Sequence, residues 1–571
     1  MAQNKLDAST PRLLPQRSLV YQAGSMPRFL LLATLLILFI ADFTFSNRHF
    51  WLYTVFYSHL HAVHHAVIRG AVGEAMPLNQ IKSLPLALAF TGLFIVLFTL
   101  YFLALRLLAH NITQRFIFRS TAVLGIGYLL LPLVTSQDVF SYIAYARMAV
   151  FYHLNPMIVP PTAIRPDFVY GFLYWVHQPS VYGPTWLAIT ATLQLLATVI
   201  GFKYVLSMEM LLRIFGLLMH LGSTWLVWLL SGRFINVNSN TDDLIWQSRR
   251  LGATLAFAWN PFLLLEACVN AHNDATILFL LLLALWFLFP HVENSRPRFL
   301  IAVVLLALIA GLKISYIILM PGILLFLFLQ SSTTRAVRER ILDVGLAILL
   351  YVGLIIAIHV PFWSHGALLR VFAMTPSASR NINSIYELLV HSYAQLRGIP
   401  LAHSIDRGSK LEVLSHILST TLFTLFYVAI CIRSIRRPQY INTWPALVAW
   451  LACTWLLYCV IGSPWYWPWY AIILFGLFAL LAMTQQELPI GRTPVHFVFG
   501  PLDVTLLAGL LSISMVGLYC LWIFYNLLPK LQPTYLTSLW VWGLPFFVMA
   551  LARMRRHGIG YHHAIRKSCH Q

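Results

Sequence analysis

The chain has 571 residues, of which 59% are hydrophobic and only 10% are charged. A soluble domain carries roughly a quarter charged residues, so this composition excludes an ordinary soluble domain and indicates an all-α polytopic membrane protein. The formal net charge of +20 does not indicate nucleic-acid binding, because the basic residues stand in short clusters between apolar runs, as in cytoplasmic loops. These clusters are Arg249 and Arg250; Arg335, Arg338 and Arg340; Arg433, Arg436 and Arg437; and Arg553, Arg555 and Arg556.

A spanning helix needs ~20 mostly apolar residues, and the runs of this kind predict about 14 transmembrane helices. They are residues 28–46, 84–108, 116–134, 206–230, 251–268, 273–290, 299–312, 314–330, 342–360, 413–433, 443–461, 467–483, 502–526 and 537–553. Lys313 interrupts the run over 299–330, which favours a broken pair of short helices there. The first apolar run lacks a small-x-small cleavage site and is expected to be an uncleaved anchor.

Segment 183–202 is apolar enough to cross the membrane but begins with Gly183-Pro184 and carries several polar residues. Charge decides its placement. Every arginine cluster falls on the cytoplasmic side only if this segment lies in the outer interface. We therefore expect both termini in the cytoplasm and large extracytoplasmic loops at 135–205 and 361–412.

The predicted organisation has five parts. A cytoplasmic tail (1–27) is followed by N-terminal spans and an outer loop (28–115), and then by the main transmembrane module (116–470). Further spans (471–553) and a basic cytoplasmic tail (554–571) complete the chain.

Asp138 comes four residues after the last apolar residue of a predicted span and opens the stretch DVFSYIAYARM, with Tyr142 and Tyr145 one and two turns further on. An acidic residue in the first turn of a helix is a common cap, stabilised by the helix dipole. A carboxylate at a membrane interface is also a functional candidate, because it can accept a proton from a bound hydroxyl.

A second polar group lies in WNPFLLLEACVNAHNDA, where His272, Asn273 and Asp274 precede an apolar run. The sequence leaves three interpretations open: a helix cap, contacts to a phosphate-bearing substrate, or a divalent metal site. Lys313 in GLKIS is either a snorkelling lysine or a cation that pairs with phosphate. Arg380, on a polar outer loop, is a similar phosphate candidate.

Two other motifs are weaker. His61 and His65 stand four residues apart in HLHAVHHAV, a spacing that can hold zinc, but no HExxH pattern is present. The aromatic run SPWYWPWY at 463–470 is typical of an interfacial belt, and stacking on a sugar is the alternative. No Walker motif or dinucleotide fingerprint occurs, so the sequence does not support an ATP-driven pump.

Taken together, these stretches resemble the GT-C superfamily of membrane glycosyltransferases and, more closely, the bacterial polyprenyl-phosphate-mannose-dependent α-mannosyltransferases. The resemblance covers approximately residues 116–470, and nothing is carried over onto residues 1–115. It rests on the stretches at 137–157, 181–184, 259–275, 312–313 and 463–469.

The resemblance implies an inverting transfer of a sugar, mannose in that family, from a polyprenyl-phosphate donor to an extracytoplasmic glycolipid or glycan. Asp138 matches the acidic residue that acts as base in the family. Lys313, Arg147 and Arg380 would neutralise the phosphate, and His272 and Asp274 would position the donor or the acceptor hydroxyl. Asn273 and Tyr182 complete the predicted substrate-binding set.

A lipid-linked donor needs no nucleotide, so no cofactor is predicted, and a divalent metal is left open. The expected location is the plasma membrane, with the active site outside the cell. Two alternatives remain: a secondary transporter or flippase for a lipid-linked or small polar substrate, and a scaffold without catalysis. Transporters usually carry internal repeats, and no repeat is found in this sequence.

Overall fold

The computed structural model describes residues 25–46, 81, 83–108, 112–133, 135–202, 204–233, 243–289, 296–330, 336–369, 375–401, 408–483, 503–528 and 534–554. The predicted tails and the His61/His65 motif lie outside these ranges, apart from a few residues at the inner ends of the tails. Within them the fold is all-helical, and the nearest approach to a sheet is one isolated bridge between Ile382 and Trp465.

Most of the α-helices follow the predicted apolar runs, whereas α6 (Asp138–Val150) and α16 (Ile385–Arg397) lie outside them. They are α1 (Ser25–Phe45), α4 (Leu84–Leu108), α5 (Gln114–Leu129), α6 (Asp138–Val150), α7 (Pro184–Val199), α8 (Val205–Arg233), α9 (Asp243–Ala258), α10 (Pro261–Leu264), α11 (Asn273–Leu288), α12 (Arg296–Leu312), α13 (Met320–Leu329), α14 (Val337–His359), α16 (Ile385–Arg397), α17 (Lys410–Arg436), α18 (Trp444–Leu457), α19 (Ile472–Ala482) and α21 (Val504–Leu527).

Shorter helical turns extend or connect these helices. The π-helical turns are η4 (Leu265–Val269), η10 (Tyr458–Gly462) and η14 (Leu539–Gly543). The 3-10 turns are η1 (Pro161–Ile164), η2 (Phe168–Phe172), η5 (Ile314–Leu319), η6 (Val360–Phe362), η7 (Ser364–Gly366), η8 (Pro376–Ala378), η9 (Pro438–Tyr440), η11 (Pro468–Ala471) and η13 (Thr534–Leu536).

In the described part of the chain, seven helices are long and apolar enough to cross a membrane, or eight if the bent pair over residues 245–269 counts as one span. This confirms the polytopic membrane class. Five of the other predicted spans correspond to shorter apolar helices, and 116–134 corresponds to the 16-residue α5. The total of about 14 crossings stays a prediction.

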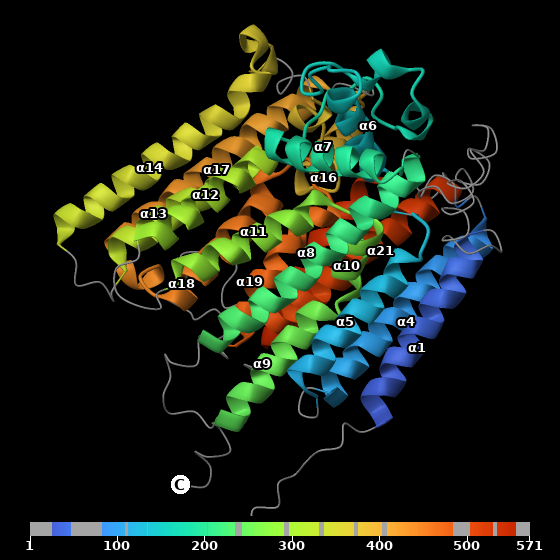
Figure 1. Ribbon diagram of the computed structural model, residues 1–571, viewed down its shortest axis with the longest axis horizontal. Coiled ribbons are helices and arrows are strands. Elements are labelled where there is room, and N and C mark those ends of the chain that lie inside the picture. Colours follow the sequence, from blue (N-terminus) through green and yellow to red (C-terminus); the bar gives the residue numbers. More distant parts are fainter. Residues whose placement is uncertain are drawn as a thin grey trace, which may run out of the picture.

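Helices α8, α11 and α19 pack against one another in the interior of the bundle (Figure 1). The N-terminal helices α1, α4 and α5 lie on one side and are joined to the rest through α21, α8 and η4. On the other side, α14 is largely exposed along its apolar length, and its Leu349 is 72% exposed. An apolar helix with so little protein contact is suited to face lipid.

The predicted span at 251–268 corresponds to a bent pair of helices, because the chain bends by 43° between residues 245–258 and 261–269. The cause is Asn260-Pro261. Proline lacks a backbone N–H and cannot continue a helix. The Asn260 side chain instead accepts hydrogen bonds from the N–H groups of Phe262 and Leu263, which caps the new helix. The predicted break at Lys313 is confirmed, since α12 ends at Leu312 and η5 begins at Ile314.

Arg213 of α8 ties three elements together in the core. Its guanidinium is fully buried, pairs with Glu209 at 3.0 Å, and donates to the carbonyls of Tyr128, Leu131 and Cys268. A buried charge is tolerated only when paired and hydrogen-bonded in this way. Arg213 thereby fixes the end of α5 and the turn η4, which leads into the candidate active site.

Helices α6 and α7 lie together at one end of the bundle, the upper end in Figure 1, where α7 runs across its neighbours. Residues 183–202, which were predicted to lie in the outer interface, contain the helix α7, and this helix packs on α6, α8 and α12. Its depth in the membrane stays a prediction.

Candidate active site

Several helix ends meet beside α6 and α7. Helix α6 begins at Asp138, α11 begins just after His272, and α12 ends just before Lys313. The start of α7 is joined to the end of α12 by a hydrogen bond of 2.9 Å from Gly183 N to Leu312 O. A side chain at Gly183 has no room, because its Cβ would lie 2.1 Å from the carbonyl oxygen of Gly311.

Asp138 is the first residue of α6, and its side chain is 15% exposed. Its Oδ2 lies 3.9 Å from Nδ1 of His272. Burial raises the pKa of Asp138 to about 6, while a hydrogen bond with Tyr182 and the charge of Lys313 favour the ionised form. A carboxyl group with this pKa is ionised at neutral pH and basic enough to take a proton from a hydroxyl. Its place in the first turn also fits the capping interpretation.

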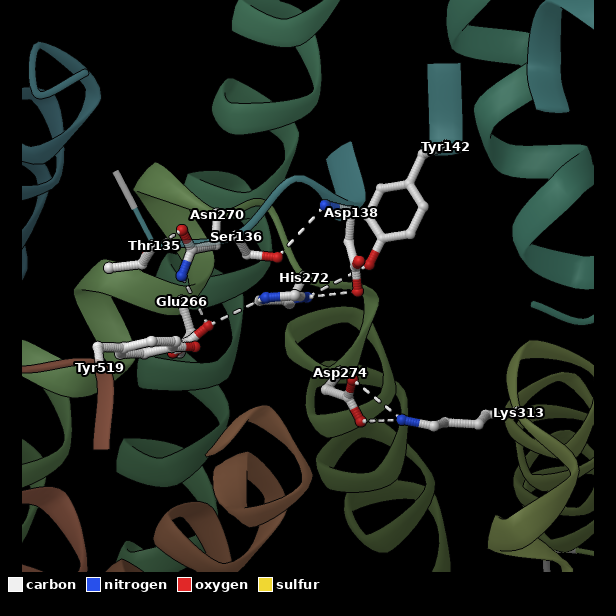
Figure 2. Close-up of polar contacts among 10 residues, drawn as sticks. All are labelled: Thr135, Ser136, Asp138, Tyr142, Glu266, Asn270, His272, Asp274, Lys313 and Tyr519. Carbon is white, nitrogen blue, oxygen red and sulfur yellow. Dashed lines mark hydrogen bonds and ion pairs between the residues drawn. The ribbon is translucent and has the colours of Figure 1, made fainter. Parts of the chain in front are cut away.

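His272 stands between two carboxyl groups, as Figure 2 shows. Its Nδ1 lies 3.3 Å from the Tyr142 hydroxyl, and its Nε2 lies 3.3 Å from Oε2 of Glu266. The imidazole stacks on Trp469 with ring centres 4.0 Å apart. Burial and the charge of Lys313 hold the pKa of His272 well below its usual value, so the ring is neutral.

Asp274 and Lys313 form the second half of the site. The Lys313 ammonium lies 3.3 and 3.4 Å from the two oxygens of Asp274, and the Tyr316 hydroxyl donates to the same carboxylate at 2.8 Å. Lys313 also sits over the ring of Tyr470, at 3.7 Å from its centre. The side chain of Lys313 is 18% exposed, whereas Asp274 is fully buried. The site thus holds a cation that is partly open and fixed by a buried counter-ion.

The remaining predicted residues divide into two groups. Tyr182 packs edge-on against Tyr142 at 4.7 Å, beside Asp138. Asn273 is buried next to His272, and its side-chain Nδ2 has no hydrogen-bond partner in the structure. Both therefore belong to the cluster.

The two arginines are held by other partners. Arg147 makes a bidentate ion pair with Asp167, at 2.9 and 3.0 Å from Nε, in the loop after α6. The Arg380 guanidinium lies 5.9 Å from the ring centre of Trp465. Trp465 belongs to the segment 463–470, which also contains Trp469, the residue that stacks on His272. The structure does not bring Arg147 into direct contact with the Asp138 cluster, and its pairing with Asp167 is a structural role in that loop.

Sequence reasoning missed Glu266, Asn270 and Tyr519. Glu266 accepts hydrogen bonds from the Tyr519 hydroxyl at 2.7 Å and from Asn270 Nδ2 at 2.9 Å, and Asn270 is in turn hydrogen-bonded to Thr135. A signal existed for Glu266, because a carboxylate inside the run LLLEACV is costly and needs a reason. No pattern pointed to Tyr519, which is 253 positions away from Glu266.

Among the described residues, no group of three or more His, Cys, Asp or Glu side chains is placed to hold a metal ion. Asp274 pairs with Lys313 and Tyr316. Nδ1 of His272 lies 3.3 Å from the Tyr142 hydroxyl, whereas its Nε2, 3.3 Å from Oε2 of Glu266, has no hydrogen-bond partner in the structure.

Comparison with known proteins places this arrangement in a class. Residues 54–329 match the family described as alpha-(1->6)-mannopyranosyltransferase, N-terminal domain. No curated protein and no solved structure matches the chain. The protein is therefore a membrane-embedded glycosyltransferase, as the sequence predicted.

More particularly, residues 54–329 match an α-mannosyltransferase family model, which confirms the predicted resemblance to GT-C enzymes. The match favours an enzyme over the transporter and scaffold alternatives. The matched range holds Asp138, Glu266, His272, Asp274 and Lys313, so most of the cluster lies within the family domain.

Proposed function

We propose that the protein transfers mannose from a polyprenyl-phosphate donor to a glycolipid or glycan acceptor, with inversion, and that Asp138 is the general base. The observation that carries this proposal is the cluster itself, in which a carboxyl group of raised pKa and a fixed cation stand on facing helix ends. Acyl transfer through a covalent intermediate finds less support, because no nucleophilic side chain paired with a base has been identified in this cluster.

In the proposed reaction, Asp138 removes the proton from an acceptor hydroxyl while that oxygen attacks the anomeric carbon of the donor. The bond from this carbon to the phosphate oxygen breaks, and the phosphate leaves with the electron pair. Lys313 stabilises the charge that develops on the phosphate, and the unpaired Asn273 amide donates to a substrate oxygen. Attack opposite the leaving phosphate inverts the anomeric configuration.

The orientation is also part of the proposal. The Asp138 end of the bundle faces the outside of the plasma membrane, and both termini are cytoplasmic, because this arrangement keeps every arginine cluster inside. An extracytoplasmic site fits a lipid-linked donor, since such a donor already carries an activated sugar and needs no cytoplasmic nucleotide.

The test uses membranes that contain the full-length protein and radiolabelled polyprenyl-phosphate-mannose. Asp138→Asn removes the base and keeps the size of the side chain. The matched control is Asp343→Asn. Asp343 lies near the start of α14, about 24 Å along the helix axis from the last residue of that helix, His359. All three proteins are brought to equal amounts before label is followed into lipid and glycan fractions.

We expect transfer by the wild type and by Asp343→Asn, and a loss of about 100-fold or more with Asp138→Asn. Transfer at wild-type rate by Asp138→Asn would remove Asp138 from the role of base. Absence of transfer from this donor, with transfer from a nucleotide sugar instead, would overturn the proposed donor class.

A further inference from the structure

A row of four tryptophans leads away from His272, and the proposed reaction does not use it. Trp469 stacks on the imidazole of His272 with ring centres 4.0 Å apart, and Trp467 stacks on Trp469 at 5.1 Å. Trp465 follows at 6.1 Å from Trp467, and Trp175 at 6.3 Å from Trp465. Trp469 is buried, whereas the other three are half-buried. The tryptophan row therefore begins in the candidate active site and becomes accessible further out.

The local sequence sets the direction of these side chains. Trp467 has extended backbone, with φ −130° and ψ 152°. Successive side chains of an extended segment point to opposite sides, so Trp465 and Trp467 share a side and Tyr466 lies on the other. Tyr466 is buried, and its hydroxyl donates to the sulfur of Met515 at 3.3 Å. The two tryptophans consequently point away from the core.

The backbone that carries the row is held by a neighbouring loop. Ile382 N donates to the carbonyl of Pro464 at 2.9 Å, and Ile382 O accepts from Tyr466 N at 3.0 Å. The side-chain amide of Asn383 also donates to the carbonyl of Tyr466, at 3.1 Å. Tryptophan has few rotatable bonds, and its backbone is fixed here before a ligand arrives. Binding on the row would thus cost little conformational entropy.

The start of the row shows which substrate it serves. Trp469 and Tyr470 are consecutive, and each contacts one half of the site. Lys313, the proposed phosphate cation, sits over the ring of Tyr470 at 3.7 Å. Trp469 instead contacts His272, whose Nδ1 is 3.9 Å from Asp138. Because the row continues from Trp469, it extends from the half that holds the proposed base, where the acceptor hydroxyl must lie.

The outer end of the row is polar. The Arg380 guanidinium lies 5.9 Å from the ring centre of Trp465, and Trp175 belongs to the loop between α6 and α7. A pyranose ring has an apolar face of C–H groups, which packs on an aromatic ring, and a rim of hydroxyls, which suits a guanidinium donor. A prenyl chain would gain nothing from that guanidinium. An interfacial belt would explain the aromatic composition, but it does not require contact with His272.

We propose that Trp467, Trp465 and Trp175 form the binding site for the acceptor glycan, in which the sugar units behind the reacting one stack along the row. The acceptor class is then a chain of several sugar units, and the row determines the preference for longer chains. Trp469 is a positioning residue that joins the row to His272. This inference rests on the proposed function, since it takes the acceptor hydroxyl to lie at Asp138.

The experiment measures mannose transfer by the purified full-length protein to octyl mannosides that carry one, two, three or four mannose units. We expect the wild-type kcat/KM to rise with acceptor length, by about 10-fold or more from one unit to four. Trp465→Leu should raise the acceptor KM about 10-fold for the four-unit acceptor and less than about twofold for the one-unit acceptor. Its kcat and its donor KM should stay within about twofold of the wild type, because this residue is remote from the reacting atoms.

Three further variants sharpen the assignment. Trp467→Leu should already weaken transfer to the two-unit acceptor, because Trp467 is nearer to His272 than Trp465 is along the row. Trp465→Phe keeps an aromatic face and should restore most of the preference for long acceptors. Trp225→Leu is the matched control. It removes a tryptophan of α8 that is 48% exposed and packs on Phe118, and it should leave the dependence on acceptor length unchanged.

The outcomes separate this inference from the proposed function. Absence of mannose transfer by the wild type would overturn the proposed function. Transfer that is independent of acceptor length in the wild type, or equal length dependence in the wild type and Trp465→Leu, would overturn the acceptor row and leave the proposed function standing. A raised donor KM with an unchanged acceptor KM would assign the row to the prenyl chain instead. Activity on the one-unit acceptor reports that each variant is folded, and should Trp467→Leu lack it, the half-buried Trp465 decides the question.

Discussion

Replacing Tyr182 with phenylalanine should move the acid limb of the pH–rate profile to higher pH. The pKa of Asp138 lies at about 6 because burial raises it, and the hydrogen bond with Tyr182 is among the interactions that oppose this rise. Only ionised Asp138 serves as base, so activity depends on the ionised fraction. In the wild type this fraction is about one-half at pH 6 and about one-tenth at pH 5.

The size of the shift follows from the hydrogen bond that is lost. A hydrogen bond to a charged group contributes about 1.5–3 kcal/mol, and a partly exposed carboxylate recovers some of this from water. A net loss of about 1.4 kcal/mol corresponds to about one pKa unit, which places the limb near pH 7. At pH 6.5 the variant should then show about one-third of the wild-type kcat/KM, and above pH 8 the two should nearly coincide.

The assay is kcat/KM for mannose transfer between pH 5 and pH 9. Tyr145→Phe is the matched control, because the Tyr145 hydroxyl donates to the carbonyl of Gln178 at 2.9 Å instead of to Asp138. Its acid limb should stay near pH 6. A limb in Tyr182→Phe that stays in place or moves to lower pH would refute the assigned hydrogen bond. A wild-type profile without a limb between pH 5 and pH 7 would refute Asp138 as the titrating base.

Further variants test the cation and the close packing. Lys313→Gln should lower kcat/KM about 100-fold, because the phosphate loses its cation and a buried carboxylate loses its partner; activity near wild type would exclude Lys313 from phosphate binding. Gly183→Ala should lower both the Tm and the activity of the purified protein, because the new Cβ would meet a backbone carbonyl at 2.1 Å. Gly345→Ala, with nothing within 4 Å of the new Cβ, is its control and should raise the Tm slightly. Equal Tm values for the two glycine variants would contradict the packing argument.

The fold could be predicted well because its main determinant is the length of apolar runs. Those runs placed most of the long helices within a few residues, and a lysine in the middle of one run marked a real break. The bend at Asn260-Pro261 was missed, because the runs on both sides of this pair together are long and apolar enough for one span. The signal was the asparagine–proline pair, a helix cap followed by a residue that cannot continue the preceding helix.

The candidate site could be predicted only in part. His272, Asp274 and Lys313 were found because polar residues at the ends of apolar runs are exceptional, and the structure brings them together with Asp138. The ion pair between Arg147 and Asp167 could not be predicted from the sequence, because it depends on how the loop after α6 folds. Glu266 was missed for a related reason. Its contact with His272 requires a π-turn, which regular helical periodicity does not indicate.

The positions of the helix breaks explain why this site needs so large a bundle around it. Irregular backbone is tolerated at membrane depth only inside protein or beside a polar cavity, since lipid offers no hydrogen bonds. The breaks at Asn260, Asn270 and Ser463 are all buried, and at each the side chain itself hydrogen-bonds to a nearby backbone or side-chain group. Helix α14 packs on α12, α13 and α7, so it covers the helix that ends at a fourth break, just before Lys313. Loss of that cover should expose the helix end that holds Lys313.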